Sequence, residues 1–233
     1  MPARISRRQP VKAVAAGGAG TRERAAQATR DAILSAAIEV FARHGYDGGR
    51  IEQVSTAANS HDRMIYYWFG SKEGLFVEVL EEIYRRFNQA EATLALDLER
   101  PLEALEAVTR FVCRYYSEHP EFVVLLNVEN LHKGRHISRS LHAREYSSPA
   151  IGLIATVLES GVRKGLFRAG LRARDVYLMI ASMGYFHQSN RYTLSAFLGE
   201  DLGAAEAQRR WESFAVAAVS RVVGRDAVTG GVG

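Results

Sequence analysis

The chain has 233 residues, of which 47% are hydrophobic and 24% are charged, and its formal net charge is +4. These values are those of an ordinary soluble globular protein, large enough to bury a core in one or two domains. A single cysteine, Cys113, excludes an internal disulfide framework, and no apolar run approaches the ~20 residues that would span a bilayer. No signal-peptide pattern is present. The sequence therefore predicts a cytoplasmic protein without a membrane partner.

The first 26 residues are predicted to form a disordered basic arm because they contain few large apolar side chains. The arm has one acidic residue, Glu23, against six cationic ones, which are Arg4, Arg7, Arg8, Lys12, Arg22 and Arg24. Two interpretations stay open. The arm is either a solvated tail or a flexible segment that neutralises DNA phosphates or enters a minor groove.

A helix predicted over residues 28–44 and ended by Gly45 is followed by two shorter helices. Ile51, Val54 and Ala58 repeat at helical spacing, residues 59–61 are turn-prone, and residues 62–67 are long enough for one more short helix. The pair is either a helix-turn-helix, whose second helix enters a major groove, or two short core helices.

The side chains of the second short helix favour the helix-turn-helix. Ile65 and Phe69 can face a core, but Arg63, Tyr66 and Tyr67 cannot all be buried beside them. Guanidinium and phenolic groups are good donors to phosphates and base edges. We therefore expect these three side chains to point outward and to contact DNA.

Four motifs in this region resemble those of the tetracycline-repressor-type (TetR) family of transcriptional regulators. They are Gly45-Tyr46, Ile51-Glu52-Gln53-Val54, Ile65-Tyr66-Tyr67-Trp68-Phe69 and Ser71-Lys72-Glu73-Gly74-Leu75. The resemblance covers residues 28–80 strongly. The rest of the chain is similar in length and helical pattern, with a looser likeness to the pyrimidine-responsive branch of the family.

The resemblance implies an all-α fold in two parts. An N-terminal three-helix helix-turn-helix domain, the head, spans residues 27–74, and a larger C-terminal helical domain for ligand binding and dimerisation, the body, spans residues 75–224. Residues 225–233 are expected to be a flexible tail. The resemblance also implies a ligand-responsive regulator, most often a repressor, that binds a palindromic operator as a homodimer and is released by a small effector. Such a protein is not an enzyme and needs no cofactor.

The chain departs from the family pattern at four positions. Arg50 replaces a phosphate-binding hydroxyl, and Asn59 replaces the glycine of the turn but tolerates a left-handed backbone. His61 replaces a capping hydroxyl residue, so Ser60 or Asp62 is expected to cap the following helix. Asp62 stands where the family often has lysine, and it is expected either to cap this helix or to accept a hydrogen bond from a cytosine amino group. These departures leave the operator sequence open, not the DNA-binding role.

The next helix is predicted over residues 72–88 and connects the head to the body. Ser71 is its expected N-cap, and Lys72 lies in the first turn, where lysine and exposed backbone amides suit one DNA phosphate. The complete set of expected DNA contacts is Arg50, Asp62, Arg63, Tyr66, Tyr67 and Lys72.

The remainder of the chain shows amphipathic helical patterns without sustained strand-like alternation. Helices are predicted over residues 101–117, 121–131, 135–146, 149–164, 175–198 and 204–223. A helical body attached to a DNA-binding head implies a cavity between helices that receives a small molecule.

Polar side chains in apolar surroundings are the candidate ligand contacts, namely Tyr115, Asn127, Asn130, His132, Tyr185 and His187. For any single one of them, an ordinary core or surface role is the alternative. If they face one cavity, the ligand is small, partly aromatic or apolar, and able to form hydrogen bonds. Glu129 and His132 lie three residues apart, but no third residue stands at metal-ligand spacing, so no metal site is predicted.

The last two long helices are expected to form the dimer interface through Val176, Ile180, Met183, Trp211, Phe214 and Ala218. The alternative is that these residues close the core of the monomer. A two-fold dimer is favoured because one short recognition helix covers too little DNA alone.

Two other classes of protein remain as alternatives. One is a small helical enzyme that uses Cys113, His132 or Glu129, although Cys113 lies in an apolar helix and no nucleophile motif or phosphate loop is present. The other is a helical adaptor that binds only protein, which leaves the basic arm and the outward tyrosines without a role.

Overall fold

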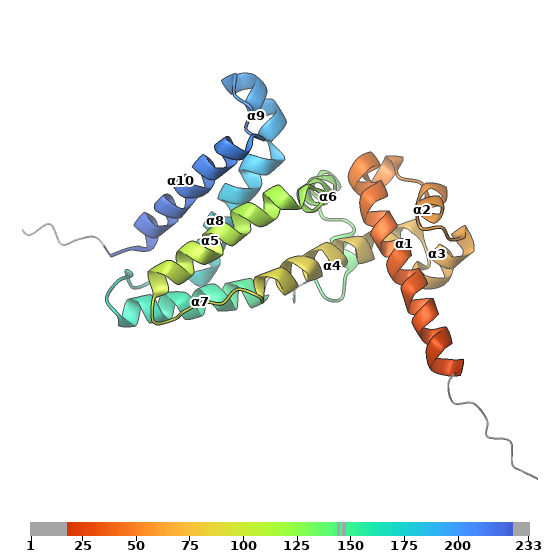
Figure 1. The fold of residues 1–233 in the computed structure, drawn as a ribbon, viewed down its shortest axis with the longest axis horizontal. Helices are drawn as coiled ribbons and strands as arrows, with labels where there is room; N and C mark the ends of the chain where they lie inside the picture. The colour runs from red at the N-terminus through yellow and green to blue at the C-terminus, as the bar shows by residue number, and fades with distance from the viewer. Residues whose placement is uncertain (1–17, 144, 146–147, 226–233) are drawn as a thin grey trace, which may run out of the picture.

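The computed structural model describes residues 18–143, 145 and 148–225. In this part of the chain it contains ten α-helices and one 3-10 helix, and no β-strand (Figure 1). The predicted all-α fold is therefore confirmed. None of the described helices is long and apolar enough to cross a membrane.

The head consists of α1 (Gly18–Gly48), α2 (Ile51–Ala57) and α3 (Asp62–Phe69), with the first turn of α4 (Lys72–Glu91). It lies at one end of the molecule, and α4 runs from it into the body (Figure 1). The head closes around apolar side chains that are almost fully buried, namely Ile33, Phe41, Val54, Ile65, Leu75 and Phe76. This core holds the two short helices in place, because neither is long enough to be stable by itself.

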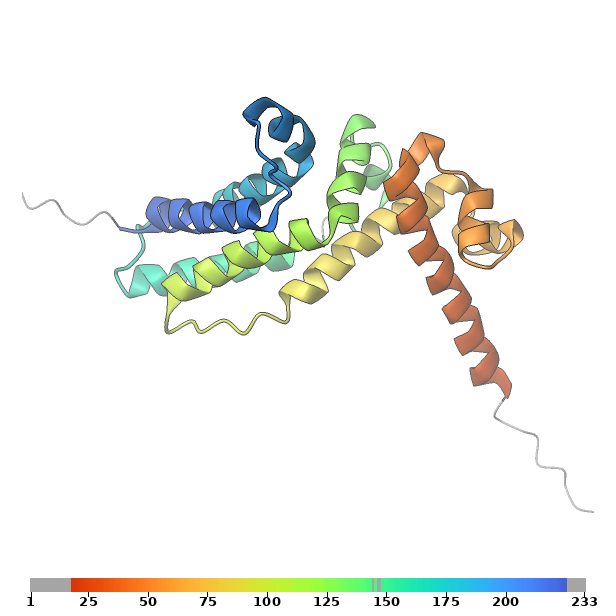
Figure 2. The ribbon, with the colours of Figure 1, turned by 45° about the horizontal axis from the view of Figure 1, so that its top comes forward.

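Helix α1 is longer than the sequence predicts. Residues 18–26, which were expected to belong to the disordered arm, form its first turns, and this part of α1 extends away from the body (Figure 2). Residues 1–17 of the arm lie outside the described residues. At Gly45 the backbone turns to φ 68°, as predicted for the end of the helix, although a short helical stretch continues to Gly48.

The body is built from α5 (Pro101–Glu118), α6 (Pro120–Leu131), α7 (Ser148–Arg163), α8 (Ala173–Ser189), α9 (Arg191–Leu198) and α10 (Ala205–Val223). Helix α5 packs against α7, α8 and α10, and α6 packs against both α1 and α8. Helix α6 therefore reaches from the body to the head (Figure 2).

The polar stretch 135–146, predicted to be helical, is a helix only over the 3-10 turn η1 (Ile137–Arg139) among its described residues. Lys133 and Gly134 have positive φ and reverse the chain after α6. The Glu129 carboxylate then accepts hydrogen bonds from the backbone N–H groups of His136 and Ile137, at 2.7 Å and 2.9 Å. A side chain thus takes the donors that an α-helix would have used internally.

The long helix predicted over residues 175–198 is divided into α8 and α9. Asn190 stands at the break, and its side-chain Nδ2 donates to the Phe186 carbonyl at 3.1 Å and to Ser189 Oγ at 2.8 Å. An asparagine that bonds to the local backbone competes with helical hydrogen bonds and ends α8. The consequence is that α9 projects as a separate short helix (Figure 1).

Candidate nucleic-acid interface and ligand cavity

The turn between α2 and α3 has the geometry of a helix-turn-helix. Asn59 adopts φ 48°, so the predicted left-handed turn residue is confirmed. The Ser60 N–H donates to the Ser55 carbonyl at 2.8 Å, and the Ser55 hydroxyl donates to Asp62 Oδ1. These bonds fix the angle between the two short helices.

The predicted capping of α3 is wrong. His61 is the N-cap residue, with φ −119° and ψ 146°, and neither Ser60 nor Asp62 supplies a side-chain cap. Asp62 instead lies in the first turn, where its carboxylate favours the helix dipole and binds Ser55. The prediction failed because sequence alone did not show that the Ser55 hydroxyl would compete for this carboxylate.

Helix α3 separates its apolar and polar side chains cleanly. Ile65 is fully buried and Phe69 is 8% exposed, whereas Tyr66 and Tyr67 are 53% and 74% exposed. Arg63 is exposed on the same helix. The outer face of α3 thus presents two phenolic hydroxyls and a guanidinium group to an approaching partner.

The corner between α3 and α4 is tightly built. As predicted, Ser71 caps α4, because its Oγ accepts the Gly74 N–H at 2.9 Å. A Cβ atom at Gly74 would lie 2.2 Å from the Phe69 carbonyl oxygen. This close approach explains why glycine stands where a glutamate would have completed a capping box.

Two more of the expected DNA contacts, Arg50 and Lys72, differ in their surroundings. Arg50 is exposed at the N-cap of α2. Lys72 is half-buried, with its ammonium group 4.7 Å from the centroid of the Tyr46 ring and 3.4 Å from the Asp47 carbonyl oxygen. Lys72 must share these contacts with any phosphate that it binds, and Asp62 is likewise already bonded.

A cavity of about 290 Å³ lies between α4, α5, α6 and α8. The Tyr185 hydroxyl donates a hydrogen bond to Asn127 Oδ1, and Asn130 Nδ2 donates to the Tyr185 oxygen at 3.4 Å. Aromatic side chains form most of the remaining wall, namely Tyr84, Phe87, Tyr116, Phe122 and Tyr177. Asn127, Asn130 and Tyr185 were therefore correctly expected to come together.

The other three predicted ligand residues lie elsewhere. Tyr115 packs on the His119 ring, 4.1 Å between centroids, on a different side of α5 from Tyr116. His132 faces the head, with its Nε2 3.5 Å from Asp47 Oδ2. His187 stacks on Trp211 at 5.0 Å and lines hollows next to α10. The six candidates therefore do not face one cavity, because neighbouring residues on a helix point about 100° apart.

Three more tyrosines line the cavity: Tyr116, which was a candidate beside Tyr115, and Tyr84 and Tyr177, which were not expected. Each follows a buried residue of its helix. The sequence shows this position but not which other helix the tyrosine faces. Burial raises the pKa of Tyr84 to about 12 and the pKa of Tyr116 well above its usual 10. Both are therefore neutral at physiological pH.

The residues expected to form a dimer interface divide into two groups. Val176 and Ile180 are 2% and 1% exposed, because α5, α7 and α10 cover α8, so they belong to the monomer core. The Trp211 indole donates to the Met183 carbonyl at 3.0 Å within the same chain, and Ala218 is half-buried. Phe214, the remaining expected residue, is exposed. Other large side chains on α8, α9 and α10 are exposed as well, namely Phe186, Tyr192, Phe197, Leu198 and Val222.

The chemistry of the remaining candidates is that of a structural core. Burial raises the pKa of Cys113 to about 11, so its thiol stays protonated. Glu129 pairs with His136 rather than with His132. Within the described residues, no group of three or more His, Cys, Asp or Glu side chains could hold a metal ion.

Comparisons with known proteins cover both halves of the chain. Residues 33–79 match the model of bacterial regulatory proteins of the tetR family, and residues 101–219 match the tetracyclin repressor-like C-terminal domain. The HTH-type transcriptional repressor NicS of Pseudomonas putida is 52% identical over 195 residues, which are 84% of this chain and 92% of NicS. The HTH-type transcriptional regulator RutR of Escherichia coli K12 is 32% identical over 48% of this chain and 52% of its own.

Solved structures agree with the fold. A TetR transcription regulator from Haloarcula marismortui superposes with a TM-score of 0.65 at 15% identity, over 85% of this chain and 99% of its own. The fatty acid degradation regulator FadR of Bacillus halodurans superposes with a TM-score of 0.57 at 21% identity, over 80% of this chain and 97% of its own. With both halves matched and a relative as similar as NicS, the chain belongs to the TetR family of bacterial transcriptional regulators, which are DNA-binding proteins and not enzymes.

Proposed function

We propose that the protein is a ligand-responsive transcriptional repressor that binds a palindromic operator as a homodimer. The observation that carries this proposal is the outer face of α3, where Tyr66 and Tyr67 are exposed over a buried base of Ile65 and Phe69. Repression is favoured because NicS, with half of its residues identical, is a repressor by name. The protein then acts in the cytoplasm, where the DNA is.

In this proposal α3 enters a major groove. Arg63, Tyr66 and Tyr67 reach base edges or the flanking phosphates, whereas Arg50 and Lys72 bind the backbone at the ends of α2 and α4. The Asp62 carboxylate accepts one hydrogen bond from Ser55 and has further lone pairs with which to accept a cytosine amino group. Two copies of the head then occupy successive major grooves, ~34 Å apart on one face of the duplex.

Affinity for DNA is expected to fall steeply with salt. The probe is a duplex selected from a random-sequence pool with the full-length protein, followed by fluorescence anisotropy at several salt concentrations. Arg50 and Lys72 from two subunits release about four counterions, which gives a slope of log affinity against log salt of about −4. The Arg50→Gln variant should reduce that slope by about 2, since one phosphate interaction disappears from each subunit. A pool that yields no preferred sequence would contradict the proposal.

The homodimer is proposed to form through the exposed aromatic side chains of α8 and α10. Phe186 and Phe214 are 56% and 59% exposed, and both line one mostly apolar hollow of about 500 Å³. A contiguous apolar surface of this kind is costly to leave in water and marks an interaction site. A second copy covers it by two-fold symmetry, with the same surface on each subunit.

The Phe186→Glu, Phe214→Glu double variant is expected to be monomeric and to bind the selected duplex roughly 100-fold more weakly, because the two heads no longer act together. Analytical ultracentrifugation measures the first effect and anisotropy the second. Leu166→Glu is the matched control, since Leu166 is 49% exposed in the turn that follows α7. A double variant that sediments as a dimer would place the interface on another surface.

The effector is proposed to bind in the cavity between α4, α5, α6 and α8. Its walls include aromatic side chains, the Asn130 amide and Tyr185, whose hydroxyl also donates to Asn127. They suit a small, partly aromatic molecule that forms hydrogen bonds. Such an effector releases DNA only to the extent that it binds better to the head arrangement that does not fit the operator.

A further inference from the structure

A second hollow, of about 380 Å³, lies between α5, α8 and α10. None of the described residues that line it also lines the proposed effector cavity. Three polar side chains at its base, Cys113, His187 and Gln188, are each more than nine-tenths buried. Charged side chains such as Arg114 and Arg209 are exposed at its rim. A hollow of this size with a few buried polar groups has the properties of a small-molecule site.

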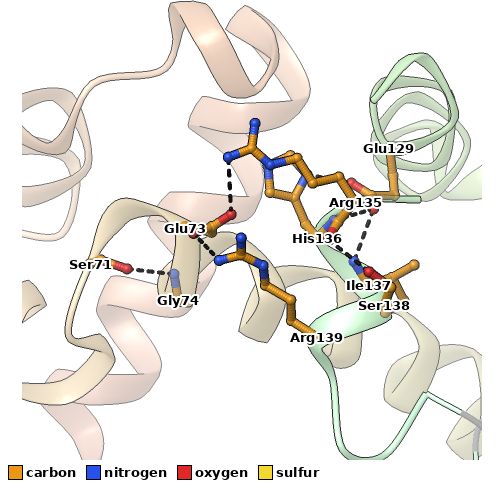
Figure 3. Close-up of polar contacts among 9 residues, drawn as sticks. All are labelled: Ser71, Glu73, Gly74, Glu129, Arg135, His136, Ile137, Ser138 and Arg139. Atoms are coloured by element: carbon orange, nitrogen blue, oxygen red, sulfur yellow. Dashed lines mark hydrogen bonds and ion pairs between the residues drawn. The ribbon is translucent and has the colours of Figure 1, made fainter. Parts of the chain in front are cut away.

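The His187 ring is a buried polar group whose nitrogens are unused. No residue that the structure describes forms a hydrogen bond with this ring, although His187 is only 5% exposed. Its contact is a stack on Trp211, with 5.0 Å between the ring centroids and 15° between the ring planes. His136, which is also buried, is different, because its Nδ1 bonds to the Glu129 carboxylate at 2.6 Å (Figure 3). Since buried polar groups are normally paired, an unpaired imidazole that lines a hollow points to a bound molecule.

The next residue, Gln188, offers a second unused group. Its Oε1 accepts a hydrogen bond from Arg191 Nη1 at 3.2 Å, and its side-chain N–H groups have no acceptor in the described part of the chain. Other polar groups of the hollow are already occupied. The Trp211 indole donates to a backbone carbonyl, and the Glu212 carboxylate accepts hydrogen bonds from two arginines. His187 and Gln188 therefore remain available to a ligand.

The base of the hollow is uncharged, which limits the chemistry of the ligand. Burial lowers the pKa of the His187 ring below its usual 6.5 and raises the pKa of the Cys113 thiol to about 11, so both groups are neutral at physiological pH. The neutral imidazole has one donor and one acceptor, and the Gln188 amide adds donors. A carboxamide complements this set because its oxygen accepts and its N–H groups donate. A carboxylate has no donor for the imidazole, and it would be desolvated beside buried lining residues of which none that the structure describes is a cation.

We propose that this hollow is a second small-molecule site, which binds an uncharged aromatic carboxamide through His187 and Gln188. The aromatic ring of the ligand lies beside Trp211, which offers a flat apolar surface. His187 and Trp211 also line the apolar hollow that contains Phe186 and Phe214, so the occupant lies next to the proposed dimer interface. Binding at this site requires neither DNA nor the effector cavity, so the inference is independent of the proposed function.

The probe is benzamide, and benzoate is its charged counterpart of nearly the same shape. The full-length protein is labelled with 15N-histidine, and the ring signals of its seven histidines are followed by NMR at neutral pH during a titration. The His187 signal, identified by its loss in His187→Phe, is expected to shift with benzamide while the other six stay in place. Benzamide should bind with a dissociation constant of about 1 mM, as expected for a ligand of its size, and benzoate at least about 10-fold more weakly.

Two variants and a matched control locate the site. His187→Phe keeps a ring beside Trp211 but removes both nitrogens, and Gln188→Met removes the amide. Each is expected to weaken benzamide binding by about 10-fold in a ligand-observed NMR titration, because hydrogen bonds to the ligand are lost. His119→Phe is the control, since His119 is partly exposed, pairs with Glu121 and does not line the hollow, and it should leave the affinity unchanged.

The contrary outcomes are equally specific. The proposal is overturned if benzamide leaves the His187 signal in place, or if both variants bind benzamide as tightly as the wild type. It is also overturned if benzoate binds as tightly as benzamide, because the arginines of the rim would then hold the ligand. If circular dichroism shows that His187→Phe does not fold, Gln188→Met decides. A failure of the proposed function is recognised separately, because it would appear as a wild type without specific DNA binding.

Discussion

Replacing Tyr66 and Tyr67 together by alanine is expected to weaken binding to the selected duplex by on the order of 100-fold or more, because each interaction with a base edge stabilises the complex by roughly 1–3 kcal/mol. The two side chains are more than half exposed, so the fold does not depend on them. The free energy of unfolding should change by no more than about 0.5 kcal/mol. Anisotropy measures the first quantity and urea denaturation the second.

The matched control for this double variant is Tyr192→Ala. Tyr192 is 74% exposed, as Tyr67 is, but it lies on α9 in the body. It should leave DNA affinity unchanged. If the double variant is folded, dimeric and still binds the duplex as tightly as the wild type, DNA is contacted by another part of the chain.

The second large effect is expected at Glu91, the last residue of α4. Its carboxyl is 4% exposed, and burial raises its pKa from 4.5 to about 7. The folded protein therefore holds a proton on Glu91 that the unfolded chain gives up between pH 4.5 and about 7. The free energy of unfolding should fall as pH rises through this window, by a total of about 3 kcal/mol at most.

Glu91→Gln is expected to remove that loss. At pH 8 the unfolding free energy of the variant should exceed that of the wild type by about 2–3 kcal/mol, whereas at pH 4 the two should agree, because Glu91 is then neutral in both states. Urea denaturation from pH 4 to 8 measures the difference. The control is Glu99→Gln, whose carboxyl is 84% exposed. If Glu91→Gln and the wild type have equal unfolding free energies at pH 8, a neighbouring group stabilises the charged Glu91 carboxylate and the prediction is contradicted.

Much of the head could be predicted from the sequence because local signals and the core agree there. The period of Ile51 and Val54, the left-handed tolerance of Asn59 and the outward surplus of Tyr66 and Tyr67 all describe the structure as found. The cap of α3 was missed because Ser55, seven residues earlier, competes for the Asp62 carboxylate. That competition depends on the angle between α2 and α3, which cannot be read from a local sequence pattern.

Most helices of the body could be predicted from the sequence, but the residues that line its cavity and its interfaces could be predicted only in part. Tyr115 and Tyr116 are adjacent in the sequence and both apolar in their surroundings, yet only Tyr116 faces the cavity. Val176 and Ile180 show the same apolar period whether a neighbouring helix or a second subunit covers them. Periodicity identifies the buried face of a helix, and the partner on that face is set by long-range packing that a single sequence does not reveal.

Hydroxyl-radical footprinting of the selected duplex tests the central claim most directly. The wild-type protein should protect two backbone patches on one face of the duplex, about 10 base pairs apart, because two copies of α3 occupy successive major grooves. The Tyr66→Ala, Tyr67→Ala variant should lose both patches at the same concentration. A single patch with the wild type, or unchanged protection with the variant, would contradict the claim that paired α3 helices read the DNA.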